Sequence, residues 1–252
     1  MIKTFLAFVF LLTLPLTYAT SSNLSAHHEN EEAVSTRAQV ESVIKDYLEN
    51  HPQAVYQALI KYRNQEMAKQ ERYSKDAVIE HYDALFNSKS PSFGSPRAKV
   101  TVVEFMDYDC AHCKIVGPRL TALAQSGQLR VIVKHLPIRG KTSLYSSQMA
   151  LAANKQGKFE PVYEALLKAE NITSDKQVDA IAEKAGVDLK QAKADMNQFQ
   201  SEIDDNFKLA TQLKLQGTPS LIFSNGNPKT AIFVPGAVSD DTLKSIIKDL
   251  HA

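Results

Sequence analysis

The feature that most constrains the fold of this chain is its pair of cysteines, Cys110 and Cys113, which are the only two among 252 residues. A β-branched apolar run, Val100–Met106, precedes the pair, and a helical pattern, Cys110–Ser126, begins with it. This placement predicts two sulfurs within bridging distance at the first turn of a helix. The positive end of the helix dipole and a neighbouring His112 cation would both stabilise a Cys110 thiolate. The sequence therefore predicts a Cys110 pKa well below ~8.5, a strongly oxidising disulfide, and Cys113 as a buried resolving thiol.

Two other roles are open to so close a cysteine pair. A structural disulfide is one, but a four-residue ring constrains little of the unfolded chain and so stabilises little. A zinc or copper site is the other; it needs two further ligands, for which His112 and His135 are available. Because a CxxC sequence that follows a strand is typical of redox proteins, thiol–disulfide chemistry is the favoured interpretation.

Strand and helix patterns alternate in the second part of the chain. The elements expected after the cysteine helix are strands over Leu129–Leu136, Leu221–Phe223 and Ala231–Val234, a helical block over 142–215, and a final helix over Asp240–Leu250. A strand, a helix and a second strand predict a parallel pair with a crossover connection, and the two late strands add an antiparallel hairpin. The prediction is an α/β fold with a mixed central sheet covered by helices, entered through a linker over Asn87–Arg97.

The first residues have the composition of an export signal. A positive start at Lys3 precedes an apolar run, Phe5–Leu16, and small residues near Ala19 fit a cleavage site there. The run is short for a membrane-spanning helix of ~20 residues, so a cleaved signal peptide over residues 1–19 is favoured over an uncleaved anchor. Export predicts a periplasmic protein in an oxidising compartment, where a thiol pair is free to form a disulfide.

The charge balance excludes a strongly basic nucleic-acid-binding protein. The chain has 29 Lys and Arg against 28 Asp and Glu, and Lys3 is the only charge in the expected signal, so cleavage leaves 28 of each sign. A nucleic-acid binder would need a basic surplus to neutralise phosphates. The polar stretch 20–36 is expected to be a disordered tail, and its His27 and His28 are expected to be exposed rather than bound to metal.

A continuous helical pattern extends over residues 37–86, and the first glycine of the chain is Gly94. Apolar side chains recur at helical spacing in a narrow stripe that starts with Val40, Val43, Ile44, Tyr47 and Leu48. Such a thin stripe cannot form a core of its own. The segment therefore packs on the following domain or pairs with copies of itself, and its long charged middle favours an extended helix that self-associates.

Four separated motifs resemble those of DsbA-type disulfide oxidoreductases of the thioredoxin fold, in the same order. They are Val103–Cys113 around the cysteines, Pro118 in the following helix, Val133–Pro137 in the second strand, and Gly217-Thr218-Pro219 before a short strand. The block 142–215 resembles the helical insertion of this branch. The resemblance covers residues 93–250 and implies a thioredoxin-like domain over 91–252, preceded by an all-helical oligomerisation segment over 37–90.

The resemblance also implies roles for individual residues. Cys110 would form the mixed disulfide with a substrate, and Cys113 would resolve it. Glu104, six positions before Cys110, corresponds to a buried acid that accepts or relays the Cys113 proton. Lys134 corresponds to a basic residue near that acid, and His112 stands beside the reactive thiol.

Three further positions would contact the substrate. Ala111 stands where DsbA itself has a proline, which leaves the reduction potential open. Pro219 would be cis, and the Thr218–Pro219 loop would offer backbone groups to an extended substrate. A threonine before the cis proline resembles disulfide isomerases of the DsbC kind, and Asp46–Pro52 resembles the oligomerisation segment of exported DsbA-like proteins that act as dimers or trimers.

These observations predict an exported thiol–disulfide oxidoreductase that isomerises, and also oxidises, the disulfides of folding proteins. Its expected partners are unfolded or misoxidised exported proteins, a membrane redox partner, and further copies of itself, as a dimer or trimer through residues 37–86. No nucleic acid, cofactor or metal is expected. The alternatives are a dedicated oxidase or reductase with few clients, and a non-catalytic holdase chaperone or copper-handling thiol protein.

Overall fold

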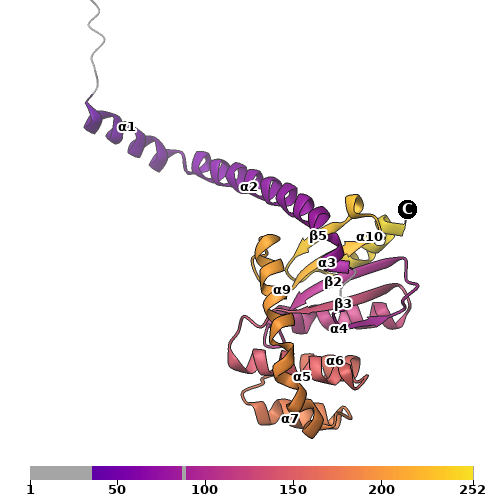
Figure 1. The fold of residues 1–252 in the computed structure, drawn as a ribbon. Helices are drawn as coiled ribbons and strands as arrows, with labels where there is room; N and C mark the ends of the chain where they lie inside the picture. The colour runs from indigo at the N-terminus through magenta and orange to yellow at the C-terminus, as the bar shows by residue number, and fades with distance from the viewer. Residues whose placement is uncertain (1–35, 87–88, 252) are drawn as a thin grey trace, which may run out of the picture. The chain divides into compact units, whose positions relative to one another are not determined.

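The structure is a computed structural model that describes residues 36–86 and 89–251 (Figure 1). The described chain divides into two compact units between Gln57 and Ala58. The expected signal peptide and the tail up to residue 35, with His27 and His28, lie outside the described residues. In the described part of the chain, no helix is both long and apolar enough to cross a membrane.

Helix α1 (Arg37–Asn50) begins at a capping box. The Thr36 backbone N–H donates to Gln39 Oε1 (2.7 Å), and the Gln39 N–H donates in return to Thr36 Oγ1 (3.4 Å). The helix ends at Asn50, with His51 as its C-cap, and α2 (Pro52–Glu80) starts with a proline, which needs no N–H partner in a first helical turn. With α3 (Tyr82–Phe86), these helices confirm the helical pattern expected after residue 37.

Five strands form the mixed sheet in the order β1-β3-β2-β4-β5. They are β1 (Ser92–Gly94), β2 (Val100–Met106), β3 (Leu129–His135), β4 (Ser220–Ser224) and β5 (Ile232–Pro235). The parallel β2–β3 pair and the antiparallel β4–β5 hairpin confirm the predicted topology.

The linker expected over Asn87–Arg97 was wrong in part, because it contains strand β1. This short strand pairs antiparallel with β3 at the edge of the sheet, and its Phe93 side chain is buried. The surrounding serines, proline and glycine gave the segment a linker composition. A strand is recognised from sequence by alternating apolar and polar residues over at least four positions. β1 has only three residues, so this pattern is absent and the composition alone indicated a linker.

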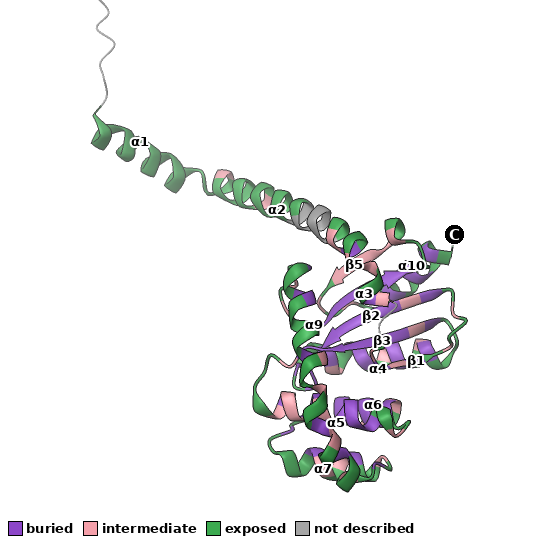
Figure 2. Cartoon of the chain, viewed as in Figure 1, coloured by how far each residue is buried: buried purple, intermediate pink, exposed green. Residues whose placement is uncertain are grey.

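Helices cover both faces of the sheet. Figure 2 shows burial concentrated on the strands and on the helix faces turned toward them. One core contains even-numbered β2 positions such as Val102, together with apolar residues of α4 (Ala111–Gln125) and α10 (Asp240–His251). The other core contains odd-numbered positions such as Phe105, with residues of α3 and α9 (Gln200–Gln212). Because successive strand side chains point to opposite faces, this parity assigns each strand residue to a core.

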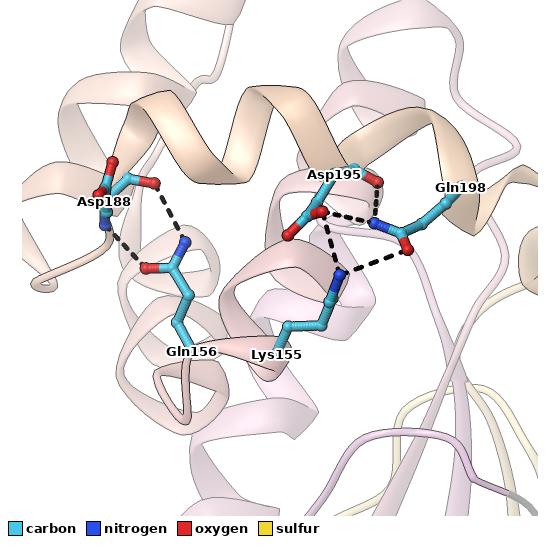
Figure 3. Close-up of polar contacts among 5 residues, drawn as sticks. All are labelled: Lys155, Gln156, Asp188, Asp195 and Gln198. Carbon is cyan, nitrogen blue, oxygen red and sulfur yellow. Dashed lines mark hydrogen bonds and ion pairs between the residues drawn. The ribbon is translucent and has the colours of Figure 1, made fainter.

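The helical insertion is packed around α5 (Lys141–Lys155) and continues through α6 (Phe159–Lys168), α7 (Asp175–Lys184) and α8 (Leu189–Asp195) to a 3₁₀ turn, Met196–Phe199, before α9. Polar contacts join the end of α5 to the α8 region (Figure 3). Lys155 pairs with Asp195 (3.0 Å), and Gln156 exchanges two hydrogen bonds with the Asp188 backbone (2.8 and 3.0 Å). The insertion brings α6 against α4, the helix that carries the cysteines.

Candidate active site

Cys110 and Cys113 lie where β2 ends and α4 begins. Cys110 is the N-cap residue of α4, and Cys113 lies in its first turn; both are free thiols and both are buried. The Cys110 Sγ lies 3.1 Å from the backbone oxygen of Thr218. The strand, the helix start and the loop before β4 therefore converge on one sulfur, with the exposed Ala111 and His112 beside it.

The Cys110 thiol is strongly acidic in this setting. Its pKa falls from 9.0 to about 4, mainly because the Cys113 thiol donates a hydrogen bond to the thiolate. Thr218 and the backbone N–H groups of Cys113 and His112 lower it further, while burial opposes them. The low pKa agrees with the sequence prediction. The backbone contribution of the helix start was expected, but the largest cause, the hydrogen bond from the Cys113 thiol, was not, and His112 acts through its backbone N–H.

Cys113 titrates in the opposite direction. Its hydrogen bond to Cys110, its burial and the nearby negative charge of Glu104 all raise the pKa of the Cys113 thiol well above its ordinary value. At neutral pH the pair therefore consists of one thiolate and one thiol. Since only a thiolate attacks a disulfide, Cys113 has to give up its proton before it can resolve a mixed disulfide.

Glu104 is the buried acid whose charge acts on the Cys113 thiol. It lies in the middle of β2, is fully buried, and accepts a hydrogen bond from the Tyr163 hydroxyl at its Oε2 (2.6 Å). Burial raises the pKa of Glu104 from 4.5 to about 7; the Tyr163 hydrogen bond lowers it, and the Cys110 charge raises it. A carboxyl group with this pKa exchanges a proton readily near neutral pH.

Lys134 does not lie beside Glu104, so the role expected for it is wrong. In the β2–β3 register Glu104 pairs with Val133 and Lys134 pairs with Phe105, which places the lysine on the opposite face of the sheet. There its Nζ donates to Ser90 Oγ (3.2 Å). Burial lowers the pKa of Lys134 to about 8, against the opposing charge of Glu202.

The loop before β4 supplies the other wall of the site. The Thr218–Pro219 peptide is cis, and Pro219 is buried. The Pro219 oxygen accepts a hydrogen bond from the Gly236 N–H (2.8 Å), so the Thr218 oxygen is the carbonyl that faces Cys110. This loop and the exposed Ala111 are the positions expected to meet a substrate.

A buried carboxylate that the sequence analysis missed fixes the loop before Cys110. Asp107 accepts hydrogen bonds from the Asp109 N–H (2.8 Å), the Ser143 hydroxyl (2.7 Å) and the Arg139 N–H (3.0 Å). These bonds tie the end of β2 to the start of the insertion. The Asp-x-Asp sequence directly before a helix start is the signal that would have indicated such a turn.

His135, considered above as a metal ligand, is used differently. It is fully buried, its Nε2 lies 3.1 Å from the Tyr108 hydroxyl, and burial lowers the pKa of His135 to about 3, so its ring is neutral. Among the described residues, no group of three or more His, Cys, Asp or Glu side chains is arranged to hold a metal ion. Tyr108 and Tyr163 were not singled out by the sequence analysis, since buried tyrosines have no distinctive spacing.

Comparison with known proteins identifies the family. The DSBA-like thioredoxin domain matches residues 101–248. The chain belongs to this family. It is 30% identical to the probable disulfide bond formation protein D of Bacillus cereus over 179 residues, 65% of this chain and 80% of that protein. It is 29% identical to the thiol:disulfide interchange protein DsbA of Burkholderia cepacia over 144 residues, 53% of this chain and 68% of that protein.

Solved structures of the DSBA-like fold extend the comparison. Salmonella enterica Typhimurium BcfH superposes with a TM-score of 0.68 at 25% identity, covering 85% of this chain and 96% of that one. The catalytic domain of Proteus mirabilis ScsC superposes with a TM-score of 0.62 at 26% identity, covering 70% of this chain and 97% of that one. With its thiolate–thiol pair, this DSBA-like protein is a thiol–disulfide oxidoreductase.

Proposed function

We propose that this protein is an exported disulfide isomerase, with additional oxidase activity, that works on misoxidised proteins as a homo-oligomer. The proposal joins two features of the chain: a Cys110 thiol that is ionised at neutral pH, and an N-terminal helix whose apolar residues are exposed. The observation that carries it is the second one, because α1 lies outside residues 101–248, which match the DSBA-like domain.

Isomerisation requires only that Cys110 attacks and leaves. The Cys110 thiolate attacks one sulfur of a wrong substrate disulfide, forms a mixed disulfide, and releases the other substrate sulfur as a thiolate. A substrate thiolate, the one just released or one formed by further exchange within the substrate, then attacks the substrate sulfur of the mixed disulfide and expels Cys110 as a thiolate again. No net electrons are transferred, and Cys113 frees the enzyme from a stalled complex by forming the Cys110–Cys113 bond and reducing the substrate.

The described N-terminal unit supports self-association. Helix α1 has 14 residues and no buried one, and Val43 and Ile44 are 69% and 52% exposed. An isolated helix of this length is marginally stable in water, and most helices are stabilised by packing an apolar face. A second copy of the same stripe is a chemically matched partner, and identical helices then make an isologous or cyclic interface. The assembly segment we propose extends over residues 37–90, and a dimer and a trimer both satisfy this argument.

The remaining parts of the proposal concern location and partners. The proposed chain begins with a signal peptide over residues 1–19, which is followed by a tail over 20–36 and, after the assembly segment, a catalytic domain over 91–252. Export through the signal peptide makes this a periplasmic protein. In support, a periplasmic thioredoxin-like protein from Salmonella enterica serovar Typhimurium is 30% identical over 68% of this chain. The clients are exported proteins with wrong disulfides, and a membrane redox partner restores the thiol state of the Cys110–Cys113 pair.

Refolding of scrambled ribonuclease tests the proposal, with two charge substitutions in α1. Ile44→Glu places a carboxylate in the apolar stripe, whereas Ser42→Glu places one on the opposite side of the same helix turn. We expect the wild type and Ser42→Glu to be oligomers by light scattering and to restore ribonuclease activity. We expect Ile44→Glu to be a monomer that still reacts at Cys110 but isomerises at least about tenfold more slowly.

The result that would reject the proposal is equally specific. A wild type that scatters as a monomer, or an Ile44→Glu monomer with full isomerase activity, would show that assembly has no part in the function. Failure of the wild type both to rescue scrambled ribonuclease and to oxidise a reduced peptide would remove the enzymatic activity itself.

A further inference from the structure

The two carboxyl oxygens of Glu104 have different environments. Oε2 accepts the hydrogen bond from the Tyr163 hydroxyl (2.6 Å), whereas Oε1 is buried and has no hydrogen-bond partner among the described residues. Tyr163 belongs to α6 and lies 59 positions further along the chain, so the helical insertion supplies this bond. One oxygen of the acid is therefore held, and the other is left open to take a proton.

Packing fixes the Tyr163 hydroxyl in this position. The ring is fully buried and contacts the rings of Phe93 (centroids 5.0 Å apart), Phe159 (5.8 Å) and Tyr108 (6.2 Å). On α4, Gly117 leaves room for the hydroxyl, because a Cβ there would lie 3.0 Å from Tyr163 Oη. The three aromatic neighbours hold the Tyr163 ring in place, and Gly117 leaves space for its hydroxyl. The direction of the hydroxyl is therefore defined.

We propose that Tyr163 is a positioning residue of the thiol–disulfide reaction, which holds Glu104 so that Oε1 exchanges a proton with the Cys113 thiol. This inference rests on the exchange chemistry of the cysteine pair. When a mixed disulfide is resolved, the Cys113 proton passes to Oε1 and the Cys113 sulfur bonds to the Cys110 sulfur. The substrate sulfur leaves with the bonding electron pair as a thiolate. In the oxidising direction, Cys113 leaves as the thiolate and takes the proton back from Glu104.

The charges around Glu104 set the pH at which this exchange works. Burial raises the pKa of Glu104 most, Tyr163 lowers it by donating to the carboxylate, and a Cys110 thiolate raises it further. The pKa of Cys113 is raised mainly by its hydrogen bond to Cys110 and those of Tyr108 and Tyr163 mainly by burial, and the negative charge of Glu104 adds to each. Removing the Tyr163 hydroxyl takes away the hydrogen bond that favours the ionised carboxyl. Glu104 then stays protonated to a higher pH, and fewer molecules have an acceptor for the Cys113 proton.

A two-step reaction with dithiobis(nitrobenzoate) separates the two cysteines. The reduced protein first releases one thionitrobenzoate as Cys110 forms a mixed disulfide, and then a second as Cys113 resolves it. The pH dependence of the second step is compared in the wild type, Tyr163→Phe, Tyr108→Phe and Glu104→Gln. Tyr108→Phe is the matched control, because it also removes a buried hydroxyl from the aromatic cluster. The Tyr108 hydroxyl is hydrogen-bonded to His135, not to Glu104.

We expect Tyr163→Phe to move the midpoint of the second step upward by about one pH unit or more, and to leave the first step unchanged. Tyr108→Phe should keep the wild-type midpoint. In Glu104→Gln the titration should disappear, and adding Tyr163→Phe should then change nothing further. An unchanged midpoint in Tyr163→Phe, or an equal shift in the Glu104→Gln background, overturns the proposal. A wild type that releases only one thionitrobenzoate overturns the exchange chemistry itself, which separates that failure from a failure of Tyr163 alone.

Discussion

At the scale of single residues, the site depends on an asymmetry between two otherwise identical side chains. Cys110 and Cys113 share one hydrogen bond, which lowers the pKa of the first thiol and raises that of the second. The helix start adds backbone N–H groups to the Cys110 side only, whereas the charge of Glu104 acts on the buried Cys113. The difference in acidity between the two thiols thus follows from where each lies along one helical turn.

Replacing the donor thiol tests this asymmetry. Cys113→Ala removes the hydrogen bond that contributes most to the acidity of Cys110, whereas Cys113→Ser keeps an O–H donor in nearly the same place. We expect the Cys110 pKa to rise from about 4 in Cys113→Ala and to rise much less in Cys113→Ser. Thiolate ultraviolet absorbance as a function of pH measures both. An equal pKa in the alanine variant and the wild type would mean that the helix start alone sets the acidity.

Lys134 shows what the sequence cannot supply at this scale. Side chains of residues 103–106 and 131–134 alternate between the two faces of the sheet, and both faces are buried. The apolar pattern therefore does not reveal whether Lys134 and Glu104 point to the same face. Only the register, with Glu104 opposite Val133, decides that Lys134 faces away from Glu104. The positions of Cys110, Cys113, Glu104 and the Thr218–Pro219 loop, in contrast, could be proposed from sequence. They belong to two short motifs in which the spacing between residues is fixed.

At the scale of elements, α4 connects the cysteines to the insertion. Its Pro118 is preceded by Gly117, and this pair lets α6 approach closely: a Cβ on Gly117 would meet Leu167 Cδ1 and Tyr163 Oη. Strands β2 to β5 and the final helix were predictable because each has apolar residues at consecutive or regularly spaced positions. The short edge strand β1 and the α4–α6 contact were not, because each depends on a tertiary partner far along the chain.

Gly117→Ala tests the close approach of α4 and α6. Although alanine favours a helix over glycine by roughly 0.5–1 kcal/mol, the added methyl group has to displace Leu167 and Tyr163, and overpacking costs about 1–3 kcal/mol. We expect a net loss of about 1 kcal/mol in urea denaturation. Ala122→Ser, at an exposed position of the same helix, is the control and should change stability little. If Gly117→Ala were as stable as the wild type, α6 would have to move away from the added methyl group without a loss of folding free energy.

At the scale of the whole molecule, the reactive groups all come from one unit. Cys110, Cys113, Glu104, Tyr163 and Thr218 lie within residues 58–252, whereas the exposed stripe of α1 lies in the unit before it. Substitutions in α1 and substitutions at the cysteine site therefore change different units of the chain. The redox state of the pair, in contrast, acts on the stability of the whole catalytic unit.

The reduced protein is expected to be more stable than the oxidised one at neutral pH. The folded-state pKa of Cys110 lies below its unfolded value, so between about 9 and about 4 the unfolded state binds more protons. The stabilisation from the thiolate is complete above the unfolded pKa and is lost as the pH falls through about 4. Glu104 has the opposite pH dependence, because its raised pKa destabilises the fold as the pH rises toward about 7, but it is present in both redox forms.

Urea denaturation of the two forms at a series of pH values measures this difference. The midpoint of the reduced form should exceed that of the oxidised form at pH 7, and the gap should shrink steadily as the pH approaches 4. A gap that is independent of pH would contradict a depressed Cys110 pKa in the folded protein.

The aromatic cluster beneath the cysteines has an optical consequence. The chain has nine tyrosines and no tryptophan, so its ultraviolet emission comes from tyrosine alone. Two of these tyrosines, Tyr108 and Tyr163, are buried beside the redox pair, and Tyr163 donates its phenolic proton toward a carboxylate that quenches such emission when it is ionised. We therefore expect the tyrosine emission of the protein to change when Glu104 gains or loses its proton, which would make proton movement at this site visible without a label.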